Sequence, residues 1–385
     1  MKRIAASLAA LAALAAPLAS AQLVVSANDG KMTLVDGVAT VLASPSPDTF
    51  AVIDLSARPP KLIFEIEAPS SIIGPPVNVA IAPGGKLALI SNSNKIDPAD
   101  AKKLAFDNRV SIIDLAANPP RVIGTVEAGA APSGISINRE GTLALVANRG
   151  DGTVTALRIA GNDVKNIGTV AIGGASSGPS HVVITPDGKM ALVTKDNDNA
   201  VSVLAIDGDK VTYDKRDLYP GVRPYGITMA PDGKSAVVGN VGRGVGDSDT
   251  IASIDLTGKW PRVVDHLTVG QQVEGLSMSH DGKMVAATVE NSSNKAKSFP
   301  FYSPNGRVVL ARLDGAKLTR MSEAPVGAWV QGSVFSSDGK MLLVQNFLDR
   351  EIQVFAIEGQ GQLRDTGQRI KLKAGPVGIR ALGSP

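Results

Sequence analysis

The chain contains no cysteine, and this absence removes several classes of site at once. Without thiols the protein has no disulfides, no covalent c-type haem attachment, no thiolate-held metal and no lipid-modified cysteine. It has only three histidines, and none belongs to a His-Glu-x-x-His motif. No Gly-x-Gly-x-x-Gly segment follows a strand and opens a helix, which disfavours nucleotide binding. The sequence therefore predicts neither a transition-metal site nor a bound cofactor.

Aromatic residues and excess charge are also scarce. Aromatic side chains make up 4% of the chain, too few for a surface on which bases could stack. The 39 Lys and Arg residues nearly balance the 36 Asp and Glu residues, which gives a formal net charge of +3. Two of the basic residues, Lys2 and Arg3, lie in the N-terminal leader described next. A nucleic-acid partner is disfavoured, because such surfaces carry clustered positive charge.

The first 21 residues have the pattern of a secretory signal peptide. Lys2 and Arg3 precede an apolar run of Ala and Leu, and the segment 19–21 (Ala-Ser-Ala) fits the small-residue rule for cleavage. The run is too short to span a bilayer, so no membrane anchor is expected. We predict Sec-type export with cleavage after Ala21, a periplasmic or secreted location, and a single domain over residues 22–385.

The most informative feature that is present is a short sequence motif that occurs seven times. An alternating apolar run leads into an Asp-Gly-Lys-like turn, and a second apolar run often ends in Asn. The turn glycines of the complete copies are Gly85, Gly141, Gly188, Gly233, Gly282 and Gly339. The remaining copy is split between the ends of the chain, since residues 23–28 match its second half and residues 376–382 its first half. A repeat cut in this way indicates a circular array.

Each repeat is predicted to contain four short strands. Around Gly141 these are 135–137, 143–148, 154–159 and 167–170, with period-two alternation and many Val and Ile residues. Asp-Gly is a strong hairpin signal. We therefore predict an all-β protein, a seven-bladed β-propeller of four-stranded antiparallel blades. The C-terminal strand completes the N-terminal blade and leaves no sheet edge open.

The repeat resembles that of the YVTN-type propellers and of the related lactonase-like seven-bladed family, which includes bacterial 6-phosphogluconolactonase. The matching residues are 186–194 (Pro-Asp-Gly-Lys-Met-Ala-Leu-Val-Thr) and 199–203 (Asn-Ala-Val-Ser-Val), with their counterparts in the other copies. The resemblance extends over essentially the whole chain after the leader. It is specific for the fold rather than for function, because such folds carry unrelated activities.

Long insertions all fall between the second and third strands of a repeat, at 30–48, 93–108, 241–250 and 291–305. These connections share one face of a propeller, while the turns of the opposite face stay short. Loop length concentrated on one face is typical of a functional surface on a rigid scaffold. The alternative is that surface loops vary in length without consequence.

The first position of each innermost strand is predicted to form a ring around the channel mouth. The ring residues are Val77, Ser133, Ser180, Tyr225, Glu274, Gln331 and Val377. The next position is Gly in most copies, which permits positive φ or close backbone approach, but it is Asn78 and His181 in two. From this ring we predict that Asn78, Tyr225 and Gln331 contact a ligand.

Arg223 precedes Tyr225 by two residues, so His181, Arg223 and Glu274 come from three successive blades and are predicted to converge at the mouth. Histidine transfers protons near neutral pH, a guanidinium binds carboxylates or oxyanions, and Glu274 would hold the imidazole or activate water. Segment 178–181 resembles the Gly-Pro-x-His segment of the lactonase family, which implies a histidine acting on a lactone ring. The alternative is a hydrogen-bonded structural histidine.

No complete catalytic motif is present, so the leading interpretation is an exported binding or scaffold module. Its loop-rich face would capture a small molecule, such as a lactone or sugar acid, or a periplasmic protein. The alternative interpretation is a metal-free lactone hydrolase. In that case His181 is the general acid and base, Arg223 binds a substrate carboxylate or phosphate, and Glu274 assists.

Overall fold

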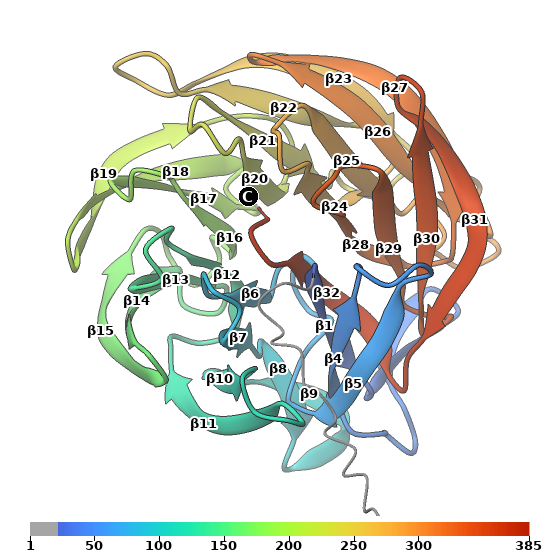
Figure 1. Ribbon diagram of the computed structural model, residues 1–385, viewed down its shortest axis with the longest axis horizontal. Coiled ribbons are helices and arrows are strands. Elements are labelled where there is room, and N and C mark those ends of the chain that lie inside the picture. The colour runs from blue at the N-terminus through green and yellow to red at the C-terminus, as the bar shows by residue number, and fades with distance from the viewer. Residues whose placement is uncertain (1–21, 385) are drawn as a thin grey trace, which may run out of the picture.

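The computed structural model describes residues 22–384 as a closed ring of seven blades around a central axis (Figure 1). Each blade is a four-stranded antiparallel sheet, and two small hairpins stand apart from the blades. The predicted fold class is confirmed. The predicted signal peptide, residues 1–21, lies outside the described residues. Residues 22–384 form no helix that is long and apolar enough to cross a membrane.

The strands occupy four radial positions in every blade. The innermost strands are β6 (Val79–Ile81), β12 (Pro132–Ile137), β16 (Pro179–Ile184), β20 (Pro224–Met229), β24 (Val273–Met278), β28 (Val330–Phe335) and β32 (Gly375–Ala381). The second strands are β7 (Leu87–Ser91), β13 (Leu143–Asn148), β17 (Met190–Lys195), β21 (Ser235–Asn240), β25 (Met284–Val289), β29 (Met341–Asn346) and β1 (Leu23–Asp29). The third strands are β10 (Arg109–Asp114), β14 (Thr153–Ala160), β18 (Ala200–Asp207), β22 (Asp249–Asp255), β26 (Gly306–Asp314), β30 (Glu351–Glu358) and β4 (Thr49–Asp54). The outer strands are β11 (Arg121–Glu127), β15 (Asp163–Ala171), β19 (Lys210–Leu218), β23 (Arg262–Gly270), β27 (Lys317–Val326), β31 (Gln362–Lys371) and β5 (Lys61–Glu67).

The second strands are apolar along their whole length because both of their faces are buried. In β13 every residue is buried. Leu143 and Leu145 pack with residues of the next blade, whereas Ala144 and Val146 pack with residues of the preceding one. Each hydrophobic cluster therefore fills the space between two blades, and a single blade could not bury both of its faces. The outer strands alternate, as expected for sheets with one solvated face.

The Asp-Gly-Lys motif forms the turn between the first and second strands of a blade. Asp187 accepts hydrogen bonds from the Thr185 hydroxyl (2.6 Å) and the Lys189 N–H (3.1 Å). Gly188 has a φ of +68°, a conformation that side chains with a Cβ rarely adopt. Asp and Gly recur here because the carboxylate fixes the turn and glycine completes it.

The residue that ends the second strand ties it to the outer part of its blade. The Asn148 side-chain amide donates to the hydroxyls of Thr153 (2.8 Å) and Thr155 (2.9 Å). Lys195 occupies the same position in the next blade, and its ammonium lies 2.9 Å from the Asp217 carboxylate. The recurring Asn therefore has a structural role, and Lys195 has the same role through its ion pair with Asp217.

The ring closes through β32 and β1, the two halves of the split repeat. They pair antiparallel from Val24 opposite Ala381 to Asp29 opposite Gly375. The side chain of Gln345 in the neighbouring blade donates to Ser26 (2.8 Å) on β1 and to the Gly378 carbonyl (2.9 Å) on β32. The C-terminal segment ends over the central axis (Figure 1).

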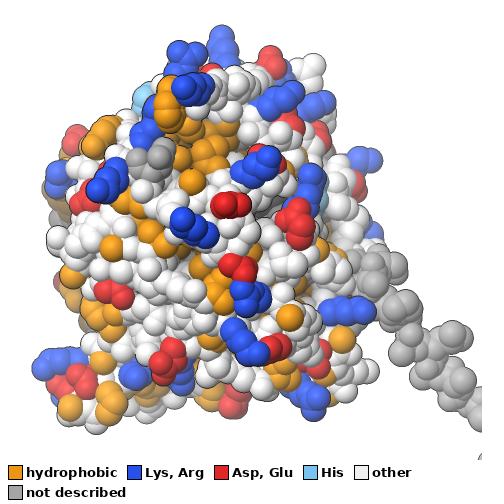
Figure 2. Space-filling model, turned by 90° about the vertical axis from the view of Figure 1, so that its left-hand side faces the viewer, with side chains coloured by type: hydrophobic (Ala, Val, Ile, Leu, Met, Phe, Trp, Pro, Cys, Tyr) orange, Lys and Arg blue, Asp and Glu red, His pale blue; other side chains and the backbone are white. Residues whose placement is uncertain are grey.

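Two of the four long insertions form hairpins rather than loops. Segment 30–48 contains β2 (Met32–Val35) and β3 (Val38–Val41), and segment 93–108 contains β8 (Asn94–Asp97) and β9 (Asp100–Phe106). All four insertions connect a second strand to a third strand, so they share one face, which we call the loop face. The opposite face, formed by the Asp-Gly-Lys turns, is the turn face. On the outer side shown in Figure 2, basic and acidic side chains are interspersed, in keeping with the balanced charge.

Candidate functional site

Charged residues gather on the loop face where the innermost strands of two blades begin. Arg149 follows β13, Asp196 follows β17 and Arg223 precedes β20. One Asp196 carboxylate oxygen accepts from both guanidinium groups, at 3.0 Å from Arg149 and 3.1 Å from Arg223. Arg149 also donates to the Ser180 hydroxyl. The Asp196 side chain is fully buried, so it holds the two arginines in fixed positions.

Tyr225 and Glu274 complete this group, which we call the loop-face cluster: Arg149, Asp196, Arg223, Tyr225 and Glu274. The Arg149 guanidinium lies 5.5 Å from the centre of the Tyr225 ring, within the range of a cation–π contact. Burial and the nearby Glu274 carboxylate raise the pKa of Tyr225 well above its usual range. The phenol therefore stays protonated and can donate a hydrogen bond at every physiological pH.

Glu274 is the titratable group of the cluster. Burial raises the pKa of Glu274 to about 8, although the positive charges of Arg223 and Arg149 act to lower it. Among residues 22–384 no basic group lies within ion-pair distance of this carboxylate. Burial and the neighbouring Glu274 also raise the pKa of Glu290 well above its usual range. With a pKa of about 8, the Glu274 carboxyl group can gain or lose its proton near neutral pH, as acid–base catalysis requires.

One segment of the chain lies across the channel mouth, near the start of the innermost strands. Residues 70–76 lead into the first innermost strand, yet Pro76 packs against Gly275 in β24 and Gly332 in β28. Gly74 of the same segment packs against Ser133 in β12. This crossing segment therefore contacts several blades at once and helps to exclude water from the mouth.

The raised pKa of Glu274 makes folding stability depend on pH. A folded-state pKa of about 8, above the usual 4.5, means that the folded protein holds this proton more tightly than the unfolded chain does. Stability is then fully present below the unfolded pKa and declines as pH rises through 8. We expect Glu274→Gln, which cannot ionise, to melt at a higher temperature than the parent above pH 8. The difference should shrink in acid, where calorimetry of both proteins provides the check.

His181 does not join the loop-face cluster. Its side chain is fully buried, and its Nδ1 accepts a hydrogen bond from the Ile227 N–H at 3.1 Å. Its Nε2 lies 3.2 Å from the Arg380 guanidinium. Burial and the charge of Arg380 hold the pKa of His181 well below its usual range, so the ring is neutral. Gly134 makes room for it, because a Cβ there would lie 2.6 Å from the His181 Cα.

The other two predicted ligand contacts lie away from the arginines. Asn78 is buried and its amide donates to the Ser70 hydroxyl at 3.1 Å. Gln331 is also buried and donates to the Val330 carbonyl at 3.2 Å. The side-chain oxygens of both residues have no hydrogen-bond partner within residues 22–384. Such orphaned acceptors are the groups that a bound water or ligand would satisfy. The ring thus brings Arg223, Tyr225 and Glu274 together and leaves Asn78, Gln331 and His181 apart.

Three residues of this region were missed by the sequence analysis: Arg149, Asp196 and Glu290. Each directly follows the last residue of a second strand, a position held elsewhere by residues such as Val241 and Phe347. The repeat alignment contains this signal, since charge appears there in only some copies. Within residues 22–384, no three His, Asp or Glu side chains are grouped so that they could hold a metal ion.

Comparisons with known proteins agree with this architecture. Residues 110–222 match the family described as "Lactonase, 7-bladed beta-propeller". A search of curated proteins gives no significant match. The resemblance to lactonase-like seven-bladed propellers that the repeat predicted is thereby confirmed.

Three solved structures illustrate the breadth of the fold. A periplasmic gluconolactonase of Pseudomonas aeruginosa is 17% identical, with a TM-score of 0.69 over 94% of this chain and 100% of that one. A proposed 6-phosphogluconolactonase of Bacteroides uniformis is 15% identical, with a TM-score of 0.71 over 93% of this chain and 98% of that one. Kuenenia stuttgartiensis hydrazine synthase is 19% identical, with a TM-score of 0.61 over 81% of this chain and 93% of that one. At these identities the likeness concerns the fold alone.

Proposed function

We propose that the protein hydrolyses a small lactone at the loop-face cluster. The observation that carries this proposal is a carboxyl group, Glu274, whose pKa is raised to about 8 beside two arginines. Arg149 and Arg223 exceed the single Asp196 carboxylate by one positive charge, which remains beside Glu274 when that base is ionised. Such a site suits a substrate that bears a carboxylate or develops an oxyanion.

The reaction uses groups of this chain only. Water adds to the carbonyl carbon of the lactone while one of its protons passes to Glu274, which acts as general base. The arginines and the Tyr225 hydroxyl donate hydrogen bonds to the oxygen on which negative charge develops. The ring C–O bond then breaks, and Glu274 returns the proton to the departing alkoxide. The product is the open hydroxy acid.

We assign the proton transfer to Glu274 rather than to His181, on geometry. The Nδ1 of His181 is occupied by the Ile227 N–H, and its Nε2 faces the cation of Arg380. A general base needs a free lone pair directed at the substrate, and neither ring nitrogen offers one. The match to the lactonase family over residues 110–222 supports the reaction class.

A hydrolysis screen tests the proposal. Purified protein spanning 22–385 is assayed against aldonolactones, muconate-type lactones and acyl-homoserine lactones, beside Glu274→Gln and His181→Ala. We expect turnover of at least one class, which Glu274→Gln abolishes and His181→Ala reduces only slightly. Loss in His181→Ala with none in Glu274→Gln would move the reaction to the histidine. No turnover of any lactone would refute hydrolysis.

Capture of a ligand or protein without turnover is the second candidate function, favoured by the rim of the loop face. Exposed apolar side chains stand on its hairpins and loops: Val35, Val38, Phe106, Val245 and Phe301. The insertions also contact one another, since Gly37 packs against Lys295 and Ala296, and Gly246 against Phe301. Shortening 93–108 or 291–305 would then abolish binding while the blades stay folded.

We also propose export to the periplasm, with cleavage after Ala21. The first strand, β1, begins at Leu23, so cleavage there would leave the propeller intact. The charged and apolar pattern of residues 1–21 supports recognition by the secretory machinery. N-terminal sequencing of protein recovered from the periplasmic fraction should begin at Gln22. Recovery of uncleaved protein from the cytoplasm would contradict export.

A further inference from the structure

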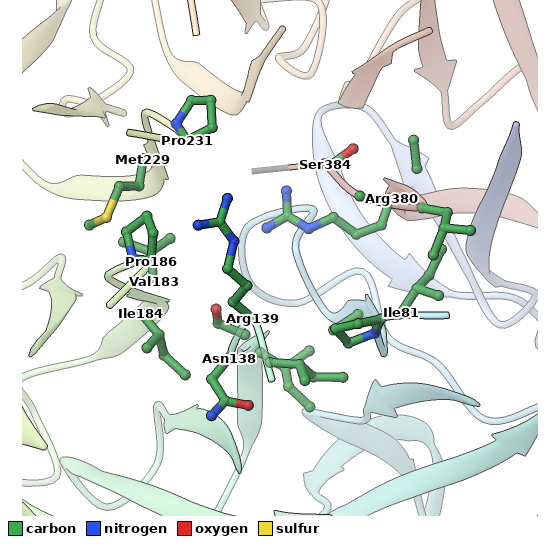
Figure 3. Close-up of a pocket in the computed structure, with 18 of the residues that line it drawn as sticks. Ile81, Asn138, Arg139, Val183, Ile184, Pro186, Met229, Pro231, Arg380 and Ser384 are labelled. Atoms are coloured by element: carbon green, nitrogen blue, oxygen red, sulfur yellow. The ribbon is translucent and has the colours of Figure 1, made fainter. Parts of the chain in front are cut away.

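A cavity of about 420 Å³ opens at the turn-face end of the central channel, opposite the loop-face cluster (Figure 3). We call it the turn-face pocket. Most of its wall is aliphatic, with Ile81, Ile137, Val183, Ile184 and Met229 among its residues. Two arginines, Arg139 and Arg380, extend into it, and Figure 3 shows their guanidinium groups directed toward the centre and toward each other. No lining residue among those described is acidic.

Both arginines are exceptions to the repeat. At the position of Arg380 the other innermost strands carry small or aliphatic residues: Ala80, Ser136, Val183, Thr228, Ser277 and Val334. Arg139 stands in the turn between the first and second strands, where three other blades have Pro83, Pro186 and Pro231. Neither residue is needed to build a blade, since the other copies fold without it. Their coincidence at one pocket therefore calls for a reason outside the blade structure.

Arg380 has no acidic neighbour among the residues that the structure describes. Among residues 22–384 no carboxylate lies within ion-pair distance of its guanidinium, and its one close polar neighbour is His181 Nε2, at 3.2 Å. Burial without a compensating acid lowers the pKa of Arg380 to about 10. A partly buried cation without a neighbouring acid is costly and is retained where something else supplies the negative charge.

The histidine cannot supply it. Because His181 Nδ1 accepts the Ile227 N–H, the single proton of the neutral ring sits on Nε2. Nε2–H and the Arg380 guanidinium are then both donors, and they face each other with no acceptor between them. His181 therefore offers Arg380 no acceptor, and the guanidinium can donate to an anion in the pocket.

We propose that the turn-face pocket binds an organic anion. Its carboxylate or phosphate head accepts from Arg380 and Arg139, and its short carbon skeleton packs on the aliphatic wall. The site is separate from the loop-face cluster and does not depend on lactone hydrolysis.

Calorimetric titration with hexanoate, its neutral analogue hexanamide and inorganic phosphate tests this proposal. We expect hexanoate to bind at least about tenfold more tightly than either of the others, because only it satisfies both the arginines and the aliphatic wall. Arg380→Gln and Arg139→Gln should each remove the preference for hexanoate. Arg223→Gln, at the loop face, should retain it. In anion-free buffer Arg380→Gln should melt at a higher temperature than the parent, since it removes a partly buried charge that has no neighbouring acid among the described residues.

Several outcomes would overturn the proposal. Equal affinity for hexanoate and hexanamide would show that the arginines play no part in binding. Equal affinity for hexanoate and inorganic phosphate would show that the aliphatic wall plays no part. Unchanged hexanoate binding in Arg380→Gln would place the anion elsewhere, as would its loss in Arg223→Gln. If Arg380→Gln fails to fold, the turn-face variant Arg139→Gln carries the test, because Arg139 is exposed.

Discussion

Glu274→Gln is expected to lower kcat for the lactone substrate by about 10²–10⁴-fold, the range that general acid–base catalysis supplies. The amide has the size of the protonated acid but cannot take a proton from water. Arg149 and Arg223 remain in place through Asp196, so KM should change little. Steady-state kinetics on the purified variant gives both constants.

Glu140→Gln is the matched control, because Glu140 is an exposed carboxylate on the turn face. It should retain the full rate. Retention of the parental kcat in Glu274→Gln would remove this residue from the reaction. A rise in KM with unchanged kcat would instead assign Glu274 to ground-state binding.

Deletion of residues 375–385 is expected to abolish the folded state. It removes β32, which pairs with β1 along its length and carries Ile379 and Ala381 into a core shared with the last blade. The deletion opens the edge of β1, uncovers the apolar residues packed against it, and invites strand pairing between molecules. The free energy of unfolding of a domain is only about 5–15 kcal/mol, and we expect the loss of one strand from the closed ring to exceed it.

Truncation after Leu382 is the control for this deletion. Leu382 still donates its N–H to the Leu23 carbonyl at 2.7 Å, so the shorter truncation keeps the closure intact. We expect it to melt within a few degrees of the parent, while the longer deletion is insoluble or unfolded by circular dichroism. A cooperative transition in the longer deletion would refute closure through the two ends of the chain.

The sequence predicts the blades well because the repeat records the same physical constraints in every copy. The strand predicted over 143–148 is β13 itself, and 154–159 lies inside β14. Glycine at position 188 and its counterparts reports a backbone that needs positive φ. The split repeat predicts the pairing of β1 with β32, since neither half could complete a blade alone.

The site is predicted less completely because the repeat pattern does not determine the direction in which each side chain points. His181 and Glu274 occupy neighbouring positions in the alignment, yet His181 turns toward Arg380 in the channel while Glu274 lies with the loop-face arginines. The segment 70–76 crosses the channel mouth and contacts Gly275 and Gly332. Local sequence patterns do not predict this path. Arg380 stands out in the aligned strands, but its significance depends on the three-dimensional structure, in which no carboxylate of the described residues lies beside it.

The central claim is that Glu274, as a base with a raised pKa, opens a lactone. The most direct test is the pH dependence of kcat/KM for a five-membered aldonolactone, corrected for spontaneous hydrolysis. Since the base acts only when deprotonated, the account predicts that the rate constant rises with pH and levels off above a midpoint near 8. The residual rate of Glu274→Gln should lack this midpoint. A profile that falls through this range, or a midpoint that persists in Glu274→Gln, would contradict the account.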